Sequence, residues 1–481
     1  MIFDFDQLSA FNIPPIVIIG SGPAGVTLAR TLANKGVDSL ILEAGGMELT
    51  ERTQETCKGK VIGDEYWDLE YSHLKYFGGA SNHWSGFCRQ LDAVDFEPRD
   101  DIDSHLGWPI AKTDLDPYLE PASKILKVPA LKEKTISRRL KEIEFALSPP
   151  VRFGDSEYEE FFRSSKRANL CLNANVISLR ARNGRIEAAE VAGPDGTVTT
   201  VRTGFAVICA GGIDNSRLLL WSNEMSEEPV VADSRTLGKY WFEHPHNMGG
   251  EVKTHGFPTE YNFPYDWTFL SPTAEAMREF RILNASIRIY HTLGDDSLPK
   301  AMARSAFCAT RPVSTGVFDR LDVSVKCADP IQLVWEQEPR SENRIELSKQ
   351  EKDGFGVPRP VLYWKKSKLD YRTAKVALEL LGRHLQEKNQ GVVHSYEHII
   401  GAKHHPATGW MAGHHHMGGT RMAERPDLGV VDRNLKIFGM ANGYVLGSSV
   451  FPHGGHANPT FTIVQMSLRL AEHLEATSRA P

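Results

Sequence analysis

Glycines near the start of the chain have the spacing of a dinucleotide-binding turn. Gly20, Gly22 and Gly25 fit the pattern G-x-G-x-x-G, directly after the β-branched run Ile16–Ile19. In such a turn the first glycine permits the tight bend, the second lets the backbone approach a pyrophosphate, and the third allows close helix–strand packing. Glu43 follows about 20 residues on, where a carboxylate can accept hydrogen bonds from the ribose hydroxyls. We therefore expect a bound dinucleotide, and the position of the motif at the N-terminus favours FAD over NAD.

Three consecutive histidines, His414, His415 and His416, place imidazole groups near the other end of the chain. Imidazole has an ordinary pKa near neutral pH, which suits it to act as a general base. Three such residues could also form a metal or surface cluster. Adjacent side chains of an extended segment point to opposite faces, however, so the three cannot all converge on one ligand. The chain has no zinc-ligand spacing, and we expect no metal site.

A second polar group follows in the run Asn458-Pro459-Thr460. Asn before Pro and an apolar periodic run is typical of a helix N-cap with Pro at the first helical position. The amide could also hold a substrate hydroxyl, and the positive end of the helix could stabilise a nearby anion. The two roles are compatible. His453 and His456 are the alternatives if Asn458 only caps the helix.

The elements that carry these residues alternate in character along the chain. Residues 16–45 predict strand, turn, helix and strand, and Leu172–Val201 predicts an antiparallel meander. Aromatic residues become frequent over 240–400, and glycine turns with short apolar strands return after 410. We therefore predict an α/β protein in which residues 1–240 and 410–481 form a discontinuous dinucleotide domain. Residues 241–409 form an inserted second domain.

Bulk composition narrows the class of protein. The 481 residues allow two domains, and a net charge of −6 argues against a nucleic-acid partner. The six cysteines include no CxxC pair, so we expect mostly reduced thiols and a cytoplasmic location. We expect neither a signal peptide nor a membrane span, since the N-terminus is acidic and no run of 18 apolar residues occurs. Attachment to a membrane through a partner subunit stays possible.

Several separated blocks of the sequence resemble the glucose–methanol–choline (GMC) oxidoreductase family. The motifs GGASNHW, EHPH and HHHMGGTRM are similar to the bacterial sugar and alcohol dehydrogenase branch, and pyranose-type oxidases share similar blocks. The resemblance implies a doubly wound, Rossmann-type FAD domain with an inserted substrate domain built on an antiparallel sheet with helices, as in p-hydroxybenzoate hydroxylase. The isoalloxazine would lie between the two domains. In chain order, the blocks are Ile16–Gly46, Phe77–Arg99, Asn173–Leu179, Ala206–Leu220, Leu237–His246, Glu336–Ser348 and Gly413–Leu474.

By this resemblance the chain oxidises a CH–OH group of a sugar, glycoside or other alcohol by hydride transfer to flavin N5. His416 matches the histidine of the family's His-x-x-Gly block and would be the base, and Asn458 matches the second catalytic position. The electron acceptor would be oxygen, a quinone or a redox protein. Two alternatives stay open: an FAD-containing lyase that uses His416 as acid and base, and an electron-transfer subunit of a membrane-associated dehydrogenase complex.

The resemblance also assigns residues to the FAD site beyond the glycine turn. His83 corresponds to a position that bonds covalently to the flavin in some relatives and not in others. The block Glu243–His246 is expected to be structural, near the domain junction. Aromatic residues of the inserted region, namely Tyr261, Tyr265, Trp267 and Tyr290, could stack on a sugar ring or fill the core. The implied cofactor contacts are Gly79, Ser81, Asn82, His83, Val176, Ala210, Gly211, Gly447, Ser448, Pro459 and Thr460.

Overall fold

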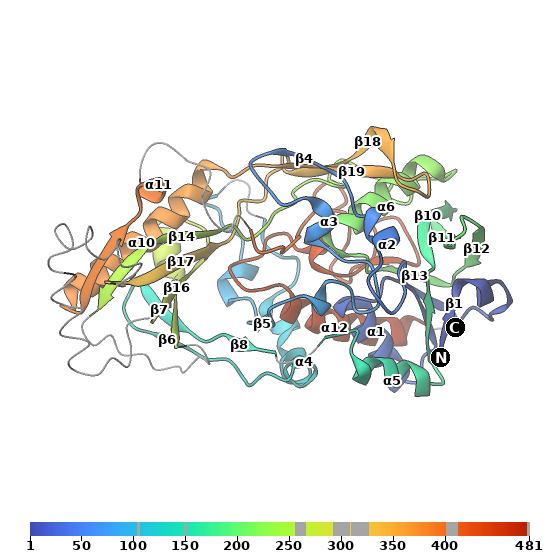
Figure 1. Cartoon of the computed structure of the whole chain (residues 1–481), viewed down its shortest axis with the longest axis horizontal. Helices are drawn as coiled ribbons and strands as arrows, with labels where there is room; N and C mark the ends of the chain where they lie inside the picture. Colours follow the sequence, from blue (N-terminus) through green and yellow to red (C-terminus); the bar gives the residue numbers. More distant parts are fainter. Residues whose placement is uncertain are drawn as a thin grey trace, which may run out of the picture.

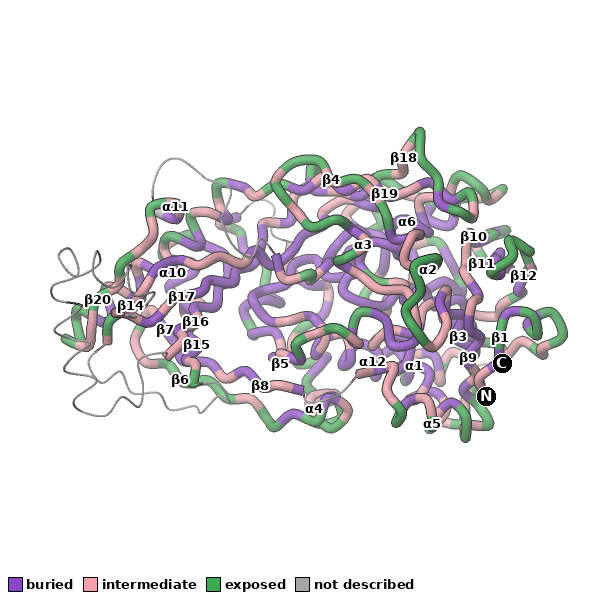
Figure 2. Tube along the Cα trace, viewed as in Figure 1, coloured by how far each residue is buried: buried purple, intermediate pink, exposed green. Residues whose placement is uncertain are grey.

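The computed structural model describes residues 1–102, 106–148, 152–254, 266–291, 308, 327–400 and 412–478. The molecule is elongated, with a different β-sheet toward each end (Figure 1). Helix α10 (Lys368–Glu387) lies at one end, and α1 (Pro23–Asn34) with α12 (Thr460–Ser478) lies toward the other. Buried residues follow the strands of both sheets (Figure 2).

A six-stranded parallel sheet forms the end that contains the glycine turn. In spatial order its strands are β1 (Ile2–Asp4), β9 (Ala168–Leu172), β3 (Ser39–Leu42), β2 (Ile16–Ile19), β13 (Phe205–Ile208) and β21 (Gly443–Val445). The central strands β2 and β3 are buried throughout, as the continuous apolar runs of a sheet covered on both faces require. Helices α1 and α12 pack against one another beside this sheet. The predicted doubly wound domain is confirmed, with its last strand and helix supplied by the C-terminal segment.

Two helices differ in length from the sequence expectation. Helix α1 starts at Pro23 rather than Val26, because proline is tolerated in the first turn, where its missing N–H has no helical partner. Helix α6 (Gly211–Met225) continues past Leu220. The meander is present as β10 (Asn175–Arg182), β11 (Arg185–Ala192) and β12 (Val198–Arg202).

A seven-stranded antiparallel sheet forms the other end. Its order is β20 (Gly391–Ser395), β14 (His246–Thr254), β17 (Asp329–Trp335), β16 (Ala285–Tyr290), β15 (Trp267–Pro272), β7 (Leu140–Ile143) and β6 (Glu133–Thr135). Strands β6 and β7 come from residues before 240, so both predicted segments contribute strands to this sheet. One face packs on α10, where Ile287 and Leu333 meet Leu378. The other face is turned toward the parallel-sheet end.

Smaller elements connect the two ends. Strands β18 (Arg344–Lys352), β19 (Pro358–Trp364) and β4 (Lys60–Gly63) form a three-stranded sheet, and β5 (Phe87–Cys88) pairs with β8 (Ala146–Leu147). The short helices are α2 (Glu51–Glu55), α3 (Leu69–Ser72), α4 (Leu119–Leu126), α5 (Ser156–Ser164), α7 (Ala274–Phe280) and α11 (Glu397–Ile400). Short 3-10 turns include η2 (Gly79–Asn82).

The cysteines do not all carry free thiols. Cys308 and Cys327 form a disulfide, so the expectation of mostly reduced thiols holds for four of the six cysteines. The four free cysteines, Cys57, Cys88, Cys171 and Cys209, are buried. In the described part of the chain, no helix has the length and apolar character that crossing a bilayer requires.

Candidate active site

A cavity of about 1330 Å³ extends from the glycine turn to the seven-stranded sheet. Its walls include Gly20 and Gly22 at one end, His415 and Asn458 along one side, and Arg288 of β16 at the antiparallel sheet. The cavity therefore joins the expected dinucleotide site to the sheet expected to bind substrate.

The glycine turn has the shape that a bound pyrophosphate requires. Gly20 has a φ of +102°, and a Cβ built on Gly25 would lie 2.0 Å from the carbonyl oxygen of Gly20. A Cβ on Gly22 would meet no atom within 4 Å, and neither would one on Gly211, where φ is +92°. Both glycines line the cavity, so a side chain at either position would occupy ligand space. This backbone therefore fits a dinucleotide such as FAD.

Glu43 lies at the end of β3 and is 5% exposed. Its carboxylate accepts hydrogen bonds from the Ser21 backbone N–H (2.9 Å), the Ser21 hydroxyl (2.6 Å) and the Gly45 N–H (3.0 Å). These bonds fix the carboxylate on the cavity wall. Two ionised oxygens offer about four acceptor sites, so capacity is left for a ribose hydroxyl.

Of the other residues expected at the FAD site, most line the cavity, and some hold the backbone of the loops that form it. Asn82 does not line the cavity; its amide donates to the Phe77 carbonyl (2.7 Å) and holds the loop. Ser81 does both, since it lines the cavity while its hydroxyl donates to Gly78 O (2.7 Å) and accepts from Phe153 N–H (3.0 Å). The remaining ones on the cavity wall are Gly79, His83, Val176, Ala210, Gly211, Gly447, Ser448, Pro459 and Thr460.

The three histidines point in different directions because the backbone turns at His414, where φ is +56°. His414 is exposed and lies beside Trp67, with ring centroids 5.5 Å apart. His415 is half-buried on the cavity wall. His416 is buried, and its Nε2 lies 3.1 Å from the Tyr66 hydroxyl. His416 also borders the cavity.

The structure brings Asn458 together with His415 rather than with His416. The Asn458 amide nitrogen lies 3.1 Å from His415 Nε2, and His415 Nδ1 lies 2.9 Å from Nδ1 of His244. An amide N–H can only donate, so Nε2 of His415 is the unprotonated nitrogen and Nδ1–H donates to His244. Burial lowers the pKa of His415 well below its usual range, assisted by the nearby His244 and His246. The ring is therefore neutral at neutral pH, and its Nε2 lone pair accepts the hydrogen bond from the Asn458 amide.

Glu243 holds the backbone of the histidine segment, His414–His416, in place through hydrogen bonds of its carboxylate. It is fully buried, and its carboxylate accepts from the backbone N–H groups of His244 and His415 (both 2.9 Å) and from the Tyr66 hydroxyl (2.5 Å). Burial raises its pKa to about 7 despite these hydrogen bonds. Among the residues of the EHPH block, Glu243 thus holds the backbone and His244 orients the ring of His415.

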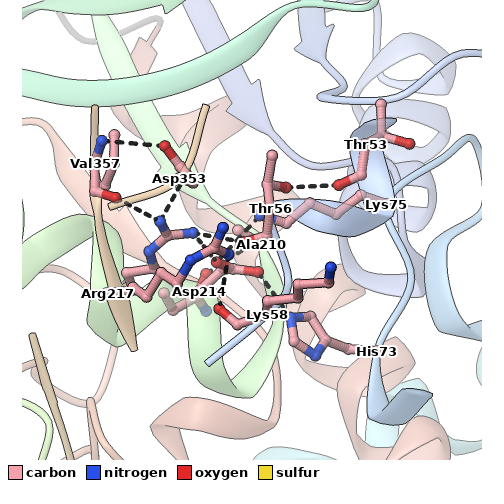
Figure 3. Close-up of polar contacts among 12 residues, drawn as sticks. Thr53, Thr56, Lys58, His73, Lys75, Ala210, Asp214, Arg217, Asp353 and Val357 are labelled. Atoms are coloured by element: carbon pink, nitrogen blue, oxygen red, sulfur yellow. Dashed lines mark hydrogen bonds and ion pairs between the residues drawn. The ribbon is translucent and has the colours of Figure 1, made fainter. Parts of the chain in front are cut away.

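A buried ionic cluster lies on another part of the same wall, at the first turn of α6 (Figure 3). Asp214 lies 3.2 Å from His73 Nε2 and 3.3 Å from Lys75 Nζ, and Arg217 lies 2.7 Å from Asp353. Burial alone would lower the pKa of His73, but the nearby Cys57 and hydrogen bonds with Asp214 and Cys57 outweigh it and raise the pKa to about 10. No sequence pattern indicated this cluster, because its members, from Cys57 to Asp353, are spread over almost 300 positions.

The same cluster contains three potential metal-ligand atoms. Those of Cys57, His73 and Asp214 lie within 4.8 Å of one another. Two cations compete for this place, however, because Lys75 lies 3.3 Å and Arg217 3.6 Å from the same Asp214 oxygen. Their charges repel a divalent ion, and a protonated His73 offers no lone pair. The arrangement is that of an ion-pair network.

The parallel sheet, the glycine turn and an imidazole–amide pair on one cavity define a flavin-dependent oxidoreductase. The model of the family described as GMC oxidoreductase matches residues 339–467, and that of an FAD binding domain matches residues 14–63. The C-terminal part of the chain is therefore a GMC oxidoreductase domain. The chain is an FAD-dependent enzyme of the class that acts on CH–OH donors.

Individual relatives are distant but span nearly the whole chain. The chain is 22% identical to paromamine 6'-oxidase of Streptomyces fradiae, covering 95% of this chain and 90% of that protein. It is 21% identical to the fructose dehydrogenase large subunit of Gluconobacter japonicus, covering 95% and 97%. Among solved structures, pyridoxine 4-oxidase from Mesorbium loti has a TM-score of 0.58 at 14% identity, over 96% of this chain and 99% of that one. A formate oxidase has a TM-score of 0.54 at 17% identity, over 97% and 98%. These structures establish the shared fold.

Proposed function

We propose that the chain oxidises a CH–OH group of a sugar, glycoside or other alcohol to the carbonyl, with His415 as the base. FAD, when bound, supplies the acceptor for the hydride that leaves carbon. The observation that carries the proposal is the unprotonated Nε2 of His415, 3.1 Å from the Asn458 amide on the wall of the FAD cavity. The substrate hydroxyl would give its proton to this nitrogen, while the amide holds the hydroxyl oxygen.

The supporting contacts explain why His415 suits this role. Its Nδ1 is held by His244 and its backbone by Glu243, so the ring is oriented before substrate arrives. His416, the base expected from the sequence, stays the alternative. Its Nε2 contacts the Tyr66 hydroxyl and not the Asn458 amide, so it is not paired with the group that would hold the substrate hydroxyl. The spacing His-x-x-Gly is met by both residues, because Gly418 and Gly419 are consecutive.

We also propose that residues 1–240 and 410–481 form the FAD-binding domain and 241–409 the substrate domain. All six parallel strands come from the first set, which supports the division. Strands β6 and β7 would then be a contribution of the FAD-binding segment to the substrate sheet. The electron acceptor would be oxygen, a quinone or a redox protein. We propose a cytoplasmic location as well, although a disulfide such as Cys308–Cys327 is rare in reducing compartments.

The test compares His415→Asn with the matched variant His416→Asn. Both holoenzymes would be mixed anaerobically with a panel of sugars, glycosides, polyols and simple alcohols, and bleaching of the flavin followed by absorbance. We expect His415→Asn to retain FAD and to slow bleaching by about 10²–10⁴-fold, the usual contribution of a general base. We expect His416→Asn to slow it less than about tenfold.

The other outcomes separate the competing functions. A large loss in His416→Asn alone would return the base role to His416. Conversion of substrate without bleaching would indicate the lyase. Unchanged electron transfer in both variants would indicate an electron-transfer subunit. Parallel assays with oxygen and with a dye acceptor distinguish an oxidase from a dehydrogenase.

A further inference from the structure

The seven-stranded sheet presents two chemically different faces. On β16, Ile287 and Ile289 point into the core against α10, while Ser286, Arg288 and Tyr290 line the cavity. The alternation is that of any strand with one buried face. The facing residues of the neighbouring strands continue this wall: Met248 on β14 and Gln332 on β17 lie in register, and Gln332 is the direct partner of Arg288. The wall opposite the glycine turn therefore carries a cationic side chain.

Arg288 is surrounded by aromatic rings instead of carboxylates. Its guanidinium carbon lies 4.7 Å from the ring centroid of Phe87, 5.2 Å from Trp267 and 5.0 Å from Phe269. One Nη donates to the Tyr290 hydroxyl (3.4 Å), which itself donates to Gln332 (2.7 Å). The Nε has no hydrogen-bond partner. Within the described residues, Arg288 forms no ion pair, and burial lowers its pKa.

An unpaired cation in such a place has an energetic cost. Removing a charge from water is costly, and the cation–π contacts with the rings offset only part of that cost. The rings thus hold the guanidinium in position but do not satisfy its N–H donors. A guanidinium has five N–H groups in a planar fork that matches a carboxylate or phosphate. One of the five is occupied by Tyr290.

Arg288 lines the same cavity as His415 and Asn458, the pair proposed to act on the substrate hydroxyl. His246 is close to His415, with ring centroids 6.0 Å apart, and the charge of Arg288 contributes to lowering the pKa of His246. The glycine turn that would hold the FAD pyrophosphate belongs to the parallel-sheet end of the molecule, whereas β16 belongs to the opposite end (Figure 1). An anion bound by Arg288 would therefore belong to the substrate.

We propose that Arg288 binds an anionic group of the alcohol substrate, a carboxylate or a phosphate. This inference rests on the proposed function and narrows its substrate class from neutral alcohols to hydroxy acids, sugar acids or phosphorylated sugars. Arg288 would act as a specificity determinant that orients the substrate, while the proton passes to His415. Trp267 and Tyr290, for which the sequence left open stacking on a sugar ring or filling the core, lie against the guanidinium. Tyr261 and Tyr265 lie outside the described residues.

The experiment compares charged and neutral members of matched pairs. The wild-type holoenzyme would be mixed anaerobically with D-glucuronate and D-glucuronamide, with D-glucose 6-phosphate and D-glucose, and with glycerate and glyceramide. Binding of acetate and inorganic phosphate would be followed by perturbation of the flavin spectrum. For the anionic compound that the wild type prefers, we expect kcat/KM or affinity to be about 10- to 100-fold higher than for its neutral partner. This is the usual gain from a charge-assisted bidentate pair. The carboxylate and phosphate pairs then identify which anion the site takes.

Variants at position 288 attribute the preference to the guanidinium. In Arg288→Gln, the anionic and the neutral member of each pair should have similar kcat/KM or affinity. Arg288→Lys should restore part of the difference between them. Arg163→Gln, at an exposed side chain of α5, is the control and should keep the wild-type ratio.

Two results would overturn the inference. One is a wild type that binds none of the anions, or prefers the neutral partners. The other is an Arg288→Gln variant in which kcat/KM or affinity falls equally for the anionic and the neutral member of each pair, which would indicate a purely structural role. Failure of the proposed function looks different, because then no compound would bleach the flavin while anion binding and its dependence on Arg288 could still be measured.

Discussion

Replacing Glu243 by glutamine tests whether this buried carboxylate supports the histidine segment as described. Glutamine can keep the contacts: its carbonyl oxygen can accept from the N–H groups of His244 and His415, and its amide can donate to the Tyr66 oxygen. The variant should therefore fold and bind FAD. What it loses is the ability to ionise, because Glu243 is fully buried and burial raises its pKa from 4.5 to about 7.

The sign and size of the effect follow from that pKa. A carboxyl with a raised pKa in the folded state contributes its full stability below pH 4.5 and loses it as pH rises through 7. At about 1.4 kcal/mol per pH unit, the free energy of unfolding should fall by about 2–3 kcal/mol between pH 5 and pH 8 in the wild type relative to Glu243→Gln. An unfolding entropy of about 2 cal/mol/K per residue gives about 1 kcal/mol/K for this chain. The expected shift in relative Tm is thus about 2–3 °C.

Thermal unfolding of both holoenzymes at pH 5 and pH 8, followed by circular dichroism and flavin fluorescence, measures this difference. Glu159→Gln on α5 is the control and should follow the wild type at both pH values. The reasoning is refuted if the wild type and Glu243→Gln change in parallel. It is also refuted if the wild type gains stability relative to the variant as pH rises, since that is the behaviour of a carboxylate with a lowered pKa.

Two further substitutions examine the cofactor site. Gly25→Ala should yield a protein without bound flavin, because the new Cβ would lie 2.0 Å from the Gly20 oxygen; the absorbance of the purified protein checks this, and Gly354→Ala, where a Cβ meets nothing within 4 Å, should stay yellow. Asp214→Asn should destabilise the protein by about 3–5 kcal/mol, since it leaves buried cations with less compensation. Chemical denaturation measures the change, and the control Asp195→Asn, in an exposed turn, should have little effect. Equal unfolding midpoints for Asp214→Asn and Asp195→Asn would contradict a stabilising role of the buried network.

Local patterns predicted the FAD end of the molecule well. The runs Ile16–Ile19 and Ser39–Leu42 are strands with the bounds that the sequence indicated, and the glycine turn lies between strand and helix. These features depend on residues close together in the chain. The pairing of β7 with β15, which joins the β6–β7 hairpin to the sheet, depends instead on contacts between residues about 130 positions apart, which no local pattern encodes.

The histidine segment shows where the sequence could not decide. His415 and His416 both have the His-x-x-Gly spacing to a following glycine. Extended backbone would place their side chains on opposite faces, but it does not say which of the two faces the cavity. The choice depends on the left-handed backbone at His414 and on the carboxylate of Glu243, about 170 residues earlier. The sequence likewise did not single out Arg288, because its role depends on aromatic rings contributed by two other strands, β5 and β15.

The late position of β21 and α12 in the chain has a consequence for biosynthesis. While the ribosome is still translating residues 412–478, the nascent chain already contains β2, β3 and β13 but lacks the strand that pairs with the free edge of β13. It also lacks α12, the helix that packs on α1. Domains form as their segments emerge, so this one can be completed only after residues 443–478 have been translated and have left the ribosome. Cofactor loading would then follow translation of α12, and premature termination before this region would leave an open hydrophobic edge for chaperones and proteases.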